Sequence, residues 1–192
     1  MSHPAPKPVR KDAVQNRAAL LAAARAVLSE QGLDAPLDLI AERAGVGRGT
    51  LYRHFADRTE LALAVLEEEV EDLGRRTAQR GDDPDAFFWF LDQLAQHMIR
   101  NACLAGVVRN FRSPDALTPL RRRLMEAGAG PLARAQAAGL VREDLGPMDI
   151  RLIATLLGAG FQNADEAERR AVSERVRALL LDGLKARPRE AR

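Results

Sequence analysis

Apolar residues recur every three or four positions through most of the chain, a spacing that predicts amphipathic helices. The first predicted helix opens at Asp12, with Gln15 as its capping partner, and ends at Gly32. Its apolar face is predicted to comprise Leu20, Ala23, Ala24, Val27 and Leu28. Val and Ile never alternate with polar residues over the length of a strand, so the chain is predicted to be all-α.

The stretch that begins at Ile40 predicts a short helix, a tight turn and a second short helix. Ile40, Ala41 and Ala44 repeat at helical spacing, and Ala41 is small enough for another helix to cross closely. Gly45 follows the last periodic residue, where helices commonly end in the left-handed conformation that Gly adopts at little cost. Gly47 is the predicted N-cap of the second helix, although it lacks a capping hydroxyl.

The second short helix, about Arg48 to Phe55, has an inner face formed by Leu51 and Phe55. Its remaining side chains suit a DNA major groove, because Gly permits close backbone approach and Arg pairs with guanine edges or phosphates. The predicted DNA contacts are Arg48, Gly49, Thr50, Tyr52, Arg53 and His54. Arg53 is the expected base reader, and Tyr52 and His54 are the expected phosphate contacts. The alternative is an ordinary helical hairpin with a solvated basic face.

A family resemblance lies in the same residues. Gly49-Thr50-Leu51-Tyr52-x-His54-Phe55, preceded by Ile40-Ala41-x-x-Ala44-Gly45-Val46 and followed by Asp57-x-x-x-Leu61, resembles the TetR family of bacterial transcriptional regulators. The resemblance covers roughly residues 12 to 66. The sequence departs from the family pattern at Gly47 and Pro36, where relatives often have Ser or Thr.

The resemblance implies a sequence-specific, DNA-binding transcriptional regulator. By this resemblance, the chain is expected to be a repressor that binds a palindromic operator as a homodimer and is released by a small-molecule effector. An N-terminal three-helix helix–turn–helix domain would be followed by a C-terminal helical domain for dimerisation and effector binding. The expected division is a disordered basic arm at 1–11, the DNA-binding domain at 12–58, the second domain at 59–187 and a tail at 188–192.

Asp57 and Glu60 form a second capping signature, which predicts a long helix from about Thr59 to Arg80 that enters the second domain. Its apolar stripe comprises Leu61, Val65, Leu66, Val70 and Leu73. The next helix is predicted to have Pro84 near its first turn. Its core residues are Phe87, Phe88, Leu91, Leu94, Ala95, Met98 and Ile99. Trp89 falls on the polar side, so it is expected to pack against another element.

Aromatic and Met side chains in the second domain usually form a core, but an effector pocket is also plausible there. The predicted effector contacts are Phe90, Leu94, His97 and Asn101, with His97 and Asn101 as the polar groups.

Breaks are predicted at Arg112-Ser113-Pro114 and at Gly128-Ala-Gly130-Pro131, with helices at Leu117–Met125 and Leu132–Leu140. The run Arg121-Arg122-Arg123 is interpreted as a solvated helix face.

The last two predicted helices suggest a subunit interface. Ile150 to Phe161 is apolar nearly all round, so it must be covered on both sides. Glu166 to Ala186 has one apolar stripe, with Leu181 outside it. That stripe comprises Val172, Val176, Leu179, Leu180 and Leu184. Two such helices from each of two subunits would form a four-helix interface, and the alternative is burial inside a monomer.

Composition adds little to this interpretation. The chain has 192 residues, 46% hydrophobic and 29% charged, with a formal net charge of +2 that is too small to imply nucleic acid by itself. Residues 1–60 contain nine Lys/Arg and seven Asp/Glu, so the excess lies in the half with the helix–turn–helix. Arg10 and Lys11 end the proline-rich arm, where they either reach the DNA or belong to a solvated tail.

Several classes of protein are not supported. No apolar run approaches the ~18 residues that would cross a membrane, and the lone Cys103 fits a reducing cytoplasm. The three His residues and Cys103 show no metal-ligand spacing, and no catalytic pair, phosphate loop or cofactor motif is present. The chain is therefore predicted not to be an enzyme. A helical protein–protein interaction module without DNA binding remains the alternative function.

Overall fold

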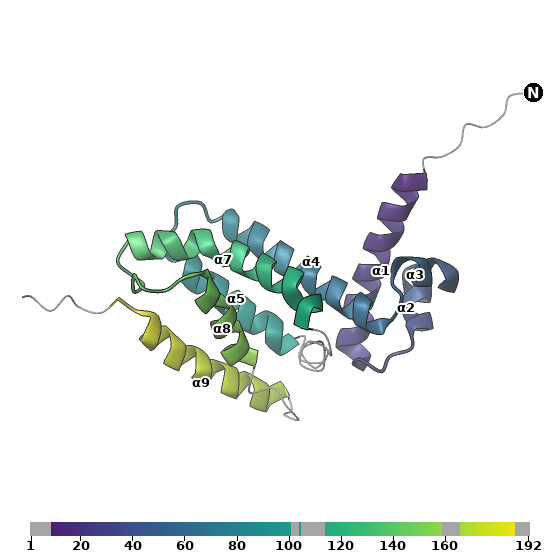
Figure 1. The fold of residues 1–192 in the computed structure, drawn as a ribbon. Coiled ribbons are helices and arrows are strands. Elements are labelled where there is room, and N and C mark those ends of the chain that lie inside the picture. Colours follow the sequence, from purple (N-terminus) through teal and green to yellow (C-terminus); the bar gives the residue numbers. More distant parts are fainter. Residues whose placement is uncertain (1–8, 101–103, 105–113, 159–165, 187–192) are drawn as a thin grey trace, which may run out of the picture. The chain divides into compact units, whose positions relative to one another are not determined.

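The computed structural model describes residues 9–100, 104, 114–158 and 166–186, and these residues are almost entirely helical (Figure 1). The helices are α1 (Val9–Gln31), α2 (Leu37–Arg43), α3 (Arg48–His54), α4 (Arg58–Ala78), α5 (Ala86–Arg100), the 3-10 helix η1 (Pro114–Leu117), α7 (Thr118–Ala137), α8 (Pro147–Gly158) and α9 (Glu166–Leu184). Within this part of the chain, the extended pairing is an isolated bridge between Val141 and Lys185. The predicted all-α fold is confirmed.

The chain divides into two compact units, Met1–Val65 and Leu66–Arg192. In the first unit, the predicted apolar face of α1 is buried and Gly32 ends the helix with a φ of 77°. The start predicted at Asp12 is wrong, because α1 begins at Val9. Arg10 and Lys11 favour helix, and no helix-breaking residue lies between Val9 and Asp12. The capping pattern at Asp12 therefore did not mark the start of α1. The rest of the predicted arm, residues 1–8, lies outside the described residues.

Helix α4 begins with the predicted capping signature. The backbone N–H of Glu60 donates to Oδ1 of Asp57 at 2.8 Å, and the N–H of Ala56 donates to Oε2 of Glu60 at 2.6 Å. Arg58 Nη1 donates to the carbonyl oxygens of Leu33 and Ala35, which ties the first turn of α4 to the α1–α2 loop. The first turns of α4 thus belong to the first unit, which extends to Val65.

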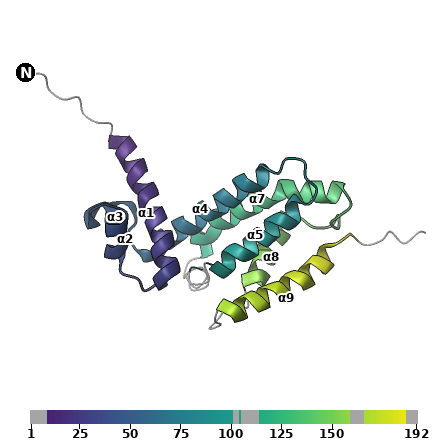
Figure 2. The same ribbon diagram turned by 180° about the vertical axis from the view of Figure 1, so that it is seen from behind.

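The second unit is built around α5, which contacts α7, α8 and α9 (Figures 1 and 2). Phe87 and Phe90 are fully buried, with ring centroids 6.5 Å apart in a stacked arrangement. Trp89 packs against α4 as predicted, because the guanidinium groups of Arg76 and Arg80 lie 5.7 and 5.2 Å from its ring centroid. Arg76 of α4 and Arg80, which follows the end of α4, thus attach this end of α4 to α5.

The predicted break at Gly128–Pro131 is wrong, because α7 runs without interruption from Thr118 to Ala137. Gly128 and Pro131 are both buried. A Cβ added to Gly128 would lie 2.8 Å from Ile150 Cδ1 and 3.0 Å from Phe90 Cε1, so this glycine permits close packing of α7 on α5 and α8. Tertiary packing therefore outweighs the low helix propensity of these two residues.

Two predicted surfaces also need correction. Leu181, expected outside the apolar stripe of α9, packs against the core together with Val176 and Leu180, whereas Leu179 of the stripe is exposed. The arginine run on α7 is not simply a solvated face, because Arg123 pairs with Glu71 and lies 3.7 Å from Glu67 of α4. Arg122 is solvent-exposed as expected.

Gly128→Ala is expected to lower the free energy of unfolding by about 1–3 kcal/mol, because the new methyl group overpacks the contact with Ile150 and Phe90. Gly130→Ala is the matched control in the same helix, where a Cβ meets only Arg134 Nη1 at 3.5 Å. The control is expected to gain up to about 1 kcal/mol from helix propensity. Urea denaturation measures both, and equal stability of the two variants would contradict the packing role of Gly128.

Candidate nucleic-acid interface

The turn between α2 and α3 has the geometry predicted from its glycine. Gly45 has a φ of 69°, in the left-handed region. Its N–H donates to the carbonyl of Glu42 at 2.9 Å, and the N–H of Val46 donates to the carbonyl of Ala41 at 3.0 Å. These two bonds form a Schellman motif, which ends α2 and directs the chain into α3.

Helix α3 begins and packs as predicted. Gly47 is its N-cap, with φ −73° and ψ 153°, and its carbonyl accepts a hydrogen bond from the N–H of Thr50 at 2.9 Å. Leu51 and Phe55 are buried, so they anchor the inner face of α3 in the first unit. The opposite face is therefore directed to solvent.

The six predicted DNA contacts lie together on the solvent-facing side and flanks of α3. Arg48, Gly49, Tyr52 and Arg53 are exposed, while Thr50 and His54 are half-buried. A Cβ added to Gly49 would meet nothing within 4 Å, so the backbone is open to a close approach there. The structure thus presents two Arg, a Thr hydroxyl, a Tyr hydroxyl and an imidazole from two helical turns.

Both arginines of this face have partners within the first unit. Arg48 Nε lies 2.5 Å from Oδ1 of Asp38 on α2. Arg53 donates from Nε to the carbonyl of Gly49 at 3.1 Å and from Nη2 to Oγ1 of Thr50 at 2.9 Å. Arg53, the expected base reader, is exposed, but its guanidinium lies along its own helix.

Sequence reasoning missed three charged residues that connect the helices of the first unit. The guanidinium of Arg17 on α1 lies 4.8 Å from the ring centroid of Phe55, next to the C-terminal end of α3. Arg43 Nη1 donates to both carboxylate oxygens of Glu30 at 2.9 Å, which joins α2 to α1. These pairs connect different helices, and no periodic spacing in the sequence could have identified them.

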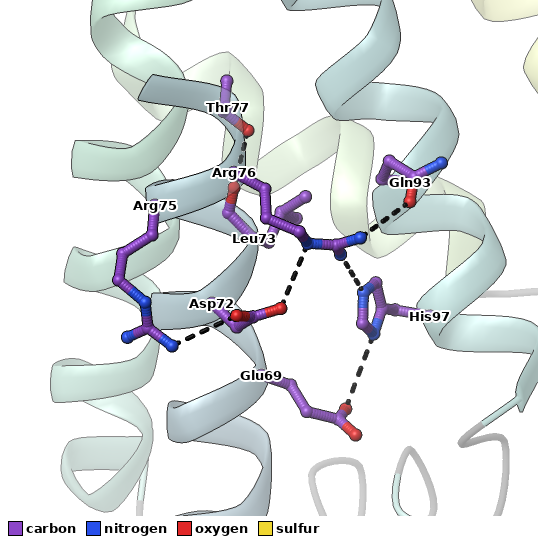
Figure 3. A network of polar contacts seen from close by, with 8 residues as sticks. All are labelled: Glu69, Asp72, Leu73, Arg75, Arg76, Thr77, Gln93 and His97. Carbon is purple, nitrogen blue, oxygen red and sulfur yellow. Dashed lines mark hydrogen bonds and ion pairs between the residues drawn. The ribbon is translucent and has the colours of Figure 1, made fainter. Parts of the chain in front are cut away.

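The described effector contacts lie in two different environments. Phe90 and Leu94 are buried in the core, and Asn101 lies outside the described residues. His97 instead joins a polar network between α4 and α5 (Figure 3). Its Nε2 lies 3.0 Å from Nη2 of Arg76, and its Nδ1 lies 3.8 Å from Oε2 of Glu69.

Arg76 is the centre of this network. Its Nε lies 3.1 Å from Oδ2 of Asp72, and its Nη1 donates to Oε1 of Gln93 at 3.4 Å (Figure 3). Carboxylates on α4 therefore balance the positive charge, and the network serves to hold α4 against α5.

A groove of about 410 Å³ lies elsewhere in the second unit, between α4 and α7. Its floor consists of small or apolar residues, and its edges carry two arginines and two glutamates. The lining residues are Val70, Glu71, Gly74, Arg122, Arg123, Glu126 and Ala127. None of the predicted effector contacts lines this groove.

Two absences hold for the part of the chain that the structure describes. No group of three or more His, Cys, Asp or Glu residues there could hold a metal ion. None of the helices in the described ranges is long and apolar enough to cross a membrane. Cys103 lies outside those ranges.

Comparison with known proteins matches both units of the chain. The family model for bacterial regulatory proteins of the tetR family matches residues 20–65, and the model for the transcriptional regulator SbtR-like C-terminal domain matches residues 82–186. An HTH-type transcriptional regulator of Staphylococcus aureus (strain bovine RF122 / ET3-1) is 33% identical over 101 residues, which are 50% of this chain and 55% of that protein. The chain thus spans about half the length of the curated relatives it matches.

Solved structures extend the similarity over nearly the whole chain. A TetR transcription regulatory protein from Mycobacterium vanbaalenii is 31% identical with a TM-score of 0.65, covering 93% of this chain and 100% of that one. A TetR transcriptional regulator from Streptomyces coelicolor is 30% identical with a TM-score of 0.64, covering 90% of this chain and 99% of that one. The relatives are named as regulators of transcription and not as enzymes.

Gly45→Ala is expected to destabilise the first unit by about 1–2 kcal/mol, because a side chain is strained in the left-handed conformation. Gly49→Ala is the matched control inside α3, where the backbone is helical and a Cβ meets nothing within 4 Å. The control is expected to keep stability or raise it by up to about 1 kcal/mol, because Ala favours helix over Gly. Thermal unfolding followed by circular dichroism compares the two, and an unaffected Gly45→Ala variant would show that the turn does not require glycine.

Proposed function

This chain belongs to the TetR family of bacterial regulatory proteins, and from that premise we propose that it is a cytoplasmic regulator that binds a palindromic operator as a homodimer. In this proposal, the protein represses transcription and a small-molecule effector relieves the repression. The observation that carries the proposal is the outer face of α3, where Arg48, Tyr52 and Arg53 are exposed beside a glycine with open space around it.

The composition of this face suits the major groove. Arginine pairs with guanine edges through two hydrogen bonds, and hydroxyl and imidazole groups commonly bind phosphates. Gly49 lets the backbone approach the bases closely, because no side chain stands between it and the groove. In this role, Arg53 exchanges the carbonyl of Gly49 and the hydroxyl of Thr50 for acceptors on the DNA.

Exposed apolar side chains on α8 and α9 support the homodimer. Leu152, Leu156 and Leu179 have exposed fractions of 48%, 50% and 57%. Large apolar residues gathered on two neighbouring helices are typical of a protein interface. A second copy covering this face would place two α3 helices on one DNA duplex, and two half-sites about 34 Å apart would then form a palindrome.

The proposed effector acts through the network that joins α4 to α5. In this proposal, the effector binds His97 and takes the place of Arg76 or Glu69 in the network. Such an exchange would alter the packing of α4 against α5, and α4 begins in the first unit and continues into the second. In this proposal, movement of α4 carries the effector signal to the DNA-binding residues.

Arg53→Ala is expected to weaken binding to the operator by about 1–3 kcal/mol and to relax base preference, because a bidentate base contact is lost. Arg53→Lys is the matched control, since it keeps the charge but cannot form the bidentate pair. Competition binding against single-base variants of the operator, itself selected from genomic fragments, provides the measurement. Equal losses on operator and random DNA for Arg53→Ala, with full rescue by lysine, would make Arg53 a phosphate contact instead.

Leu156→Glu and Leu179→Glu are each expected to dissociate the dimer, because two like charges would be buried across the two-fold interface. Operator affinity should then fall by at least about 100-fold, since each DNA-binding domain would bind its half-site alone. Ala137→Glu, at an exposed position on α7, is the control and should leave both properties unchanged. Sedimentation equilibrium gives the mass, and a Leu156→Glu variant that remains dimeric would place the interface elsewhere.

A further inference from the structure

We propose that Asp38 sets the affinity of this protein for DNA by competing with DNA phosphates for Arg48. The inference rests on the proposed DNA-binding function and adds to it a residue that makes no favourable contact with DNA. In the free protein, the carboxylate of Asp38 occupies the position on the Arg48 guanidinium that a phosphate oxygen would take.

Arg48 and Asp38 form an ion pair between α3 and α2. Arg48 is the first residue of α3, and Asp38 lies in the first turn of α2. Arg48 Nε lies 2.5 Å from Asp38 Oδ1, and the side chains are 70% and 49% exposed. Both groups are thus accessible to solvent, so a phosphate can reach Arg48 and replace the carboxylate.

The second arginine of α3 provides an internal comparison. Arg53 is held by a backbone carbonyl and a Thr hydroxyl, both of which are neutral. Those partners orient Arg53 without cancelling its charge. Asp38, in contrast, neutralises Arg48, so the N-terminal part of the recognition surface attracts DNA less than its arginine content suggests.

The position of the pair makes this loss of attraction relevant to binding. The N-terminal residues of a recognition helix approach the DNA most closely. Binding through Arg48 must therefore break the ion pair and leave the Asp38 carboxylate close to phosphates. Both effects weaken binding to every DNA sequence. They also reduce by about one the number of phosphates that the protein neutralises, so the affinity depends less steeply on salt.

The test compares Asp38→Asn with Asp34→Asn, which removes the same charge from the exposed turn between α1 and α2. Binding to a random-sequence 30-base-pair duplex and to the selected operator is measured across a salt series. Asp38→Asn is expected to raise affinity for both duplexes by about two- to five-fold and to steepen the log–log salt slope by about 0.9. Asp34→Asn should change both quantities less.

The same comparison in an Arg48→Ala background shows whether Asp38 changes DNA affinity through Arg48. If Asp38 acts through Arg48, the gain from Asp38→Asn disappears in that background. A gain that persists there, or one that Asp34→Asn reproduces, would overturn the proposal. Thermal unfolding of each variant confirms that the helix–turn–helix is intact.

A measurement without DNA separates this inference from the proposed function. The ¹⁵N–¹H resonance of Arg48 Nε should shift when Asp38→Asn removes the ion pair and stay in place in Asp34→Asn. An unchanged resonance would show that the pair does not form in solution and would refute the inference even if the protein binds DNA. Failure of every variant to bind either duplex at low salt would refute the proposed function, and the competition with it.

Discussion

The orientation of α3 depends on the burial of Leu51 and Phe55, which fixes the direction of every other side chain on that helix. A helix of seven residues makes few contacts of its own, so these two anchors and the Schellman turn at Gly45 determine its position. Arg17 of α1 lies over the ring of Phe55, so α1 also contacts this anchor of α3. The outer residues can therefore be polar, because none of them is needed for packing.

Interactions that are local in sequence were predictable. The inner face of α3 follows from the helical period, the turn from the low cost of a left-handed glycine, and the start of α4 from the capping pattern of Asp57 and Glu60. Each of these rules involves residues no more than a few positions apart, and the structure agrees at each of them. The resemblance to a known family pointed to the same residues.

Features that depend on contacts between distant helices were not predictable. The propensities of Gly128 and Pro131 indicate a break, but the fit of Gly128 against Phe90 and Ile150 keeps α7 continuous. Phe90 and His97 were both predicted to contact an effector, and the structure places Phe90 in the core and pairs His97 with Arg76 of α4. Periodicity shows which residues share a face but does not identify what that face contacts. The pair of Asp38 and Arg48 was missed for the same reason.

Regulation of transcription requires that this protein select one DNA sequence, so the most direct measurement is selection of genomic fragments by the purified protein. Retained fragments are sequenced and their binding is followed across a salt series. A sequence-specific dimer should retain a single palindrome whose half-sites lie about one helical turn apart, with a steep dependence on salt. Retention of no fragment even at low salt would contradict DNA binding and would leave a helical protein–protein interaction module as the better description.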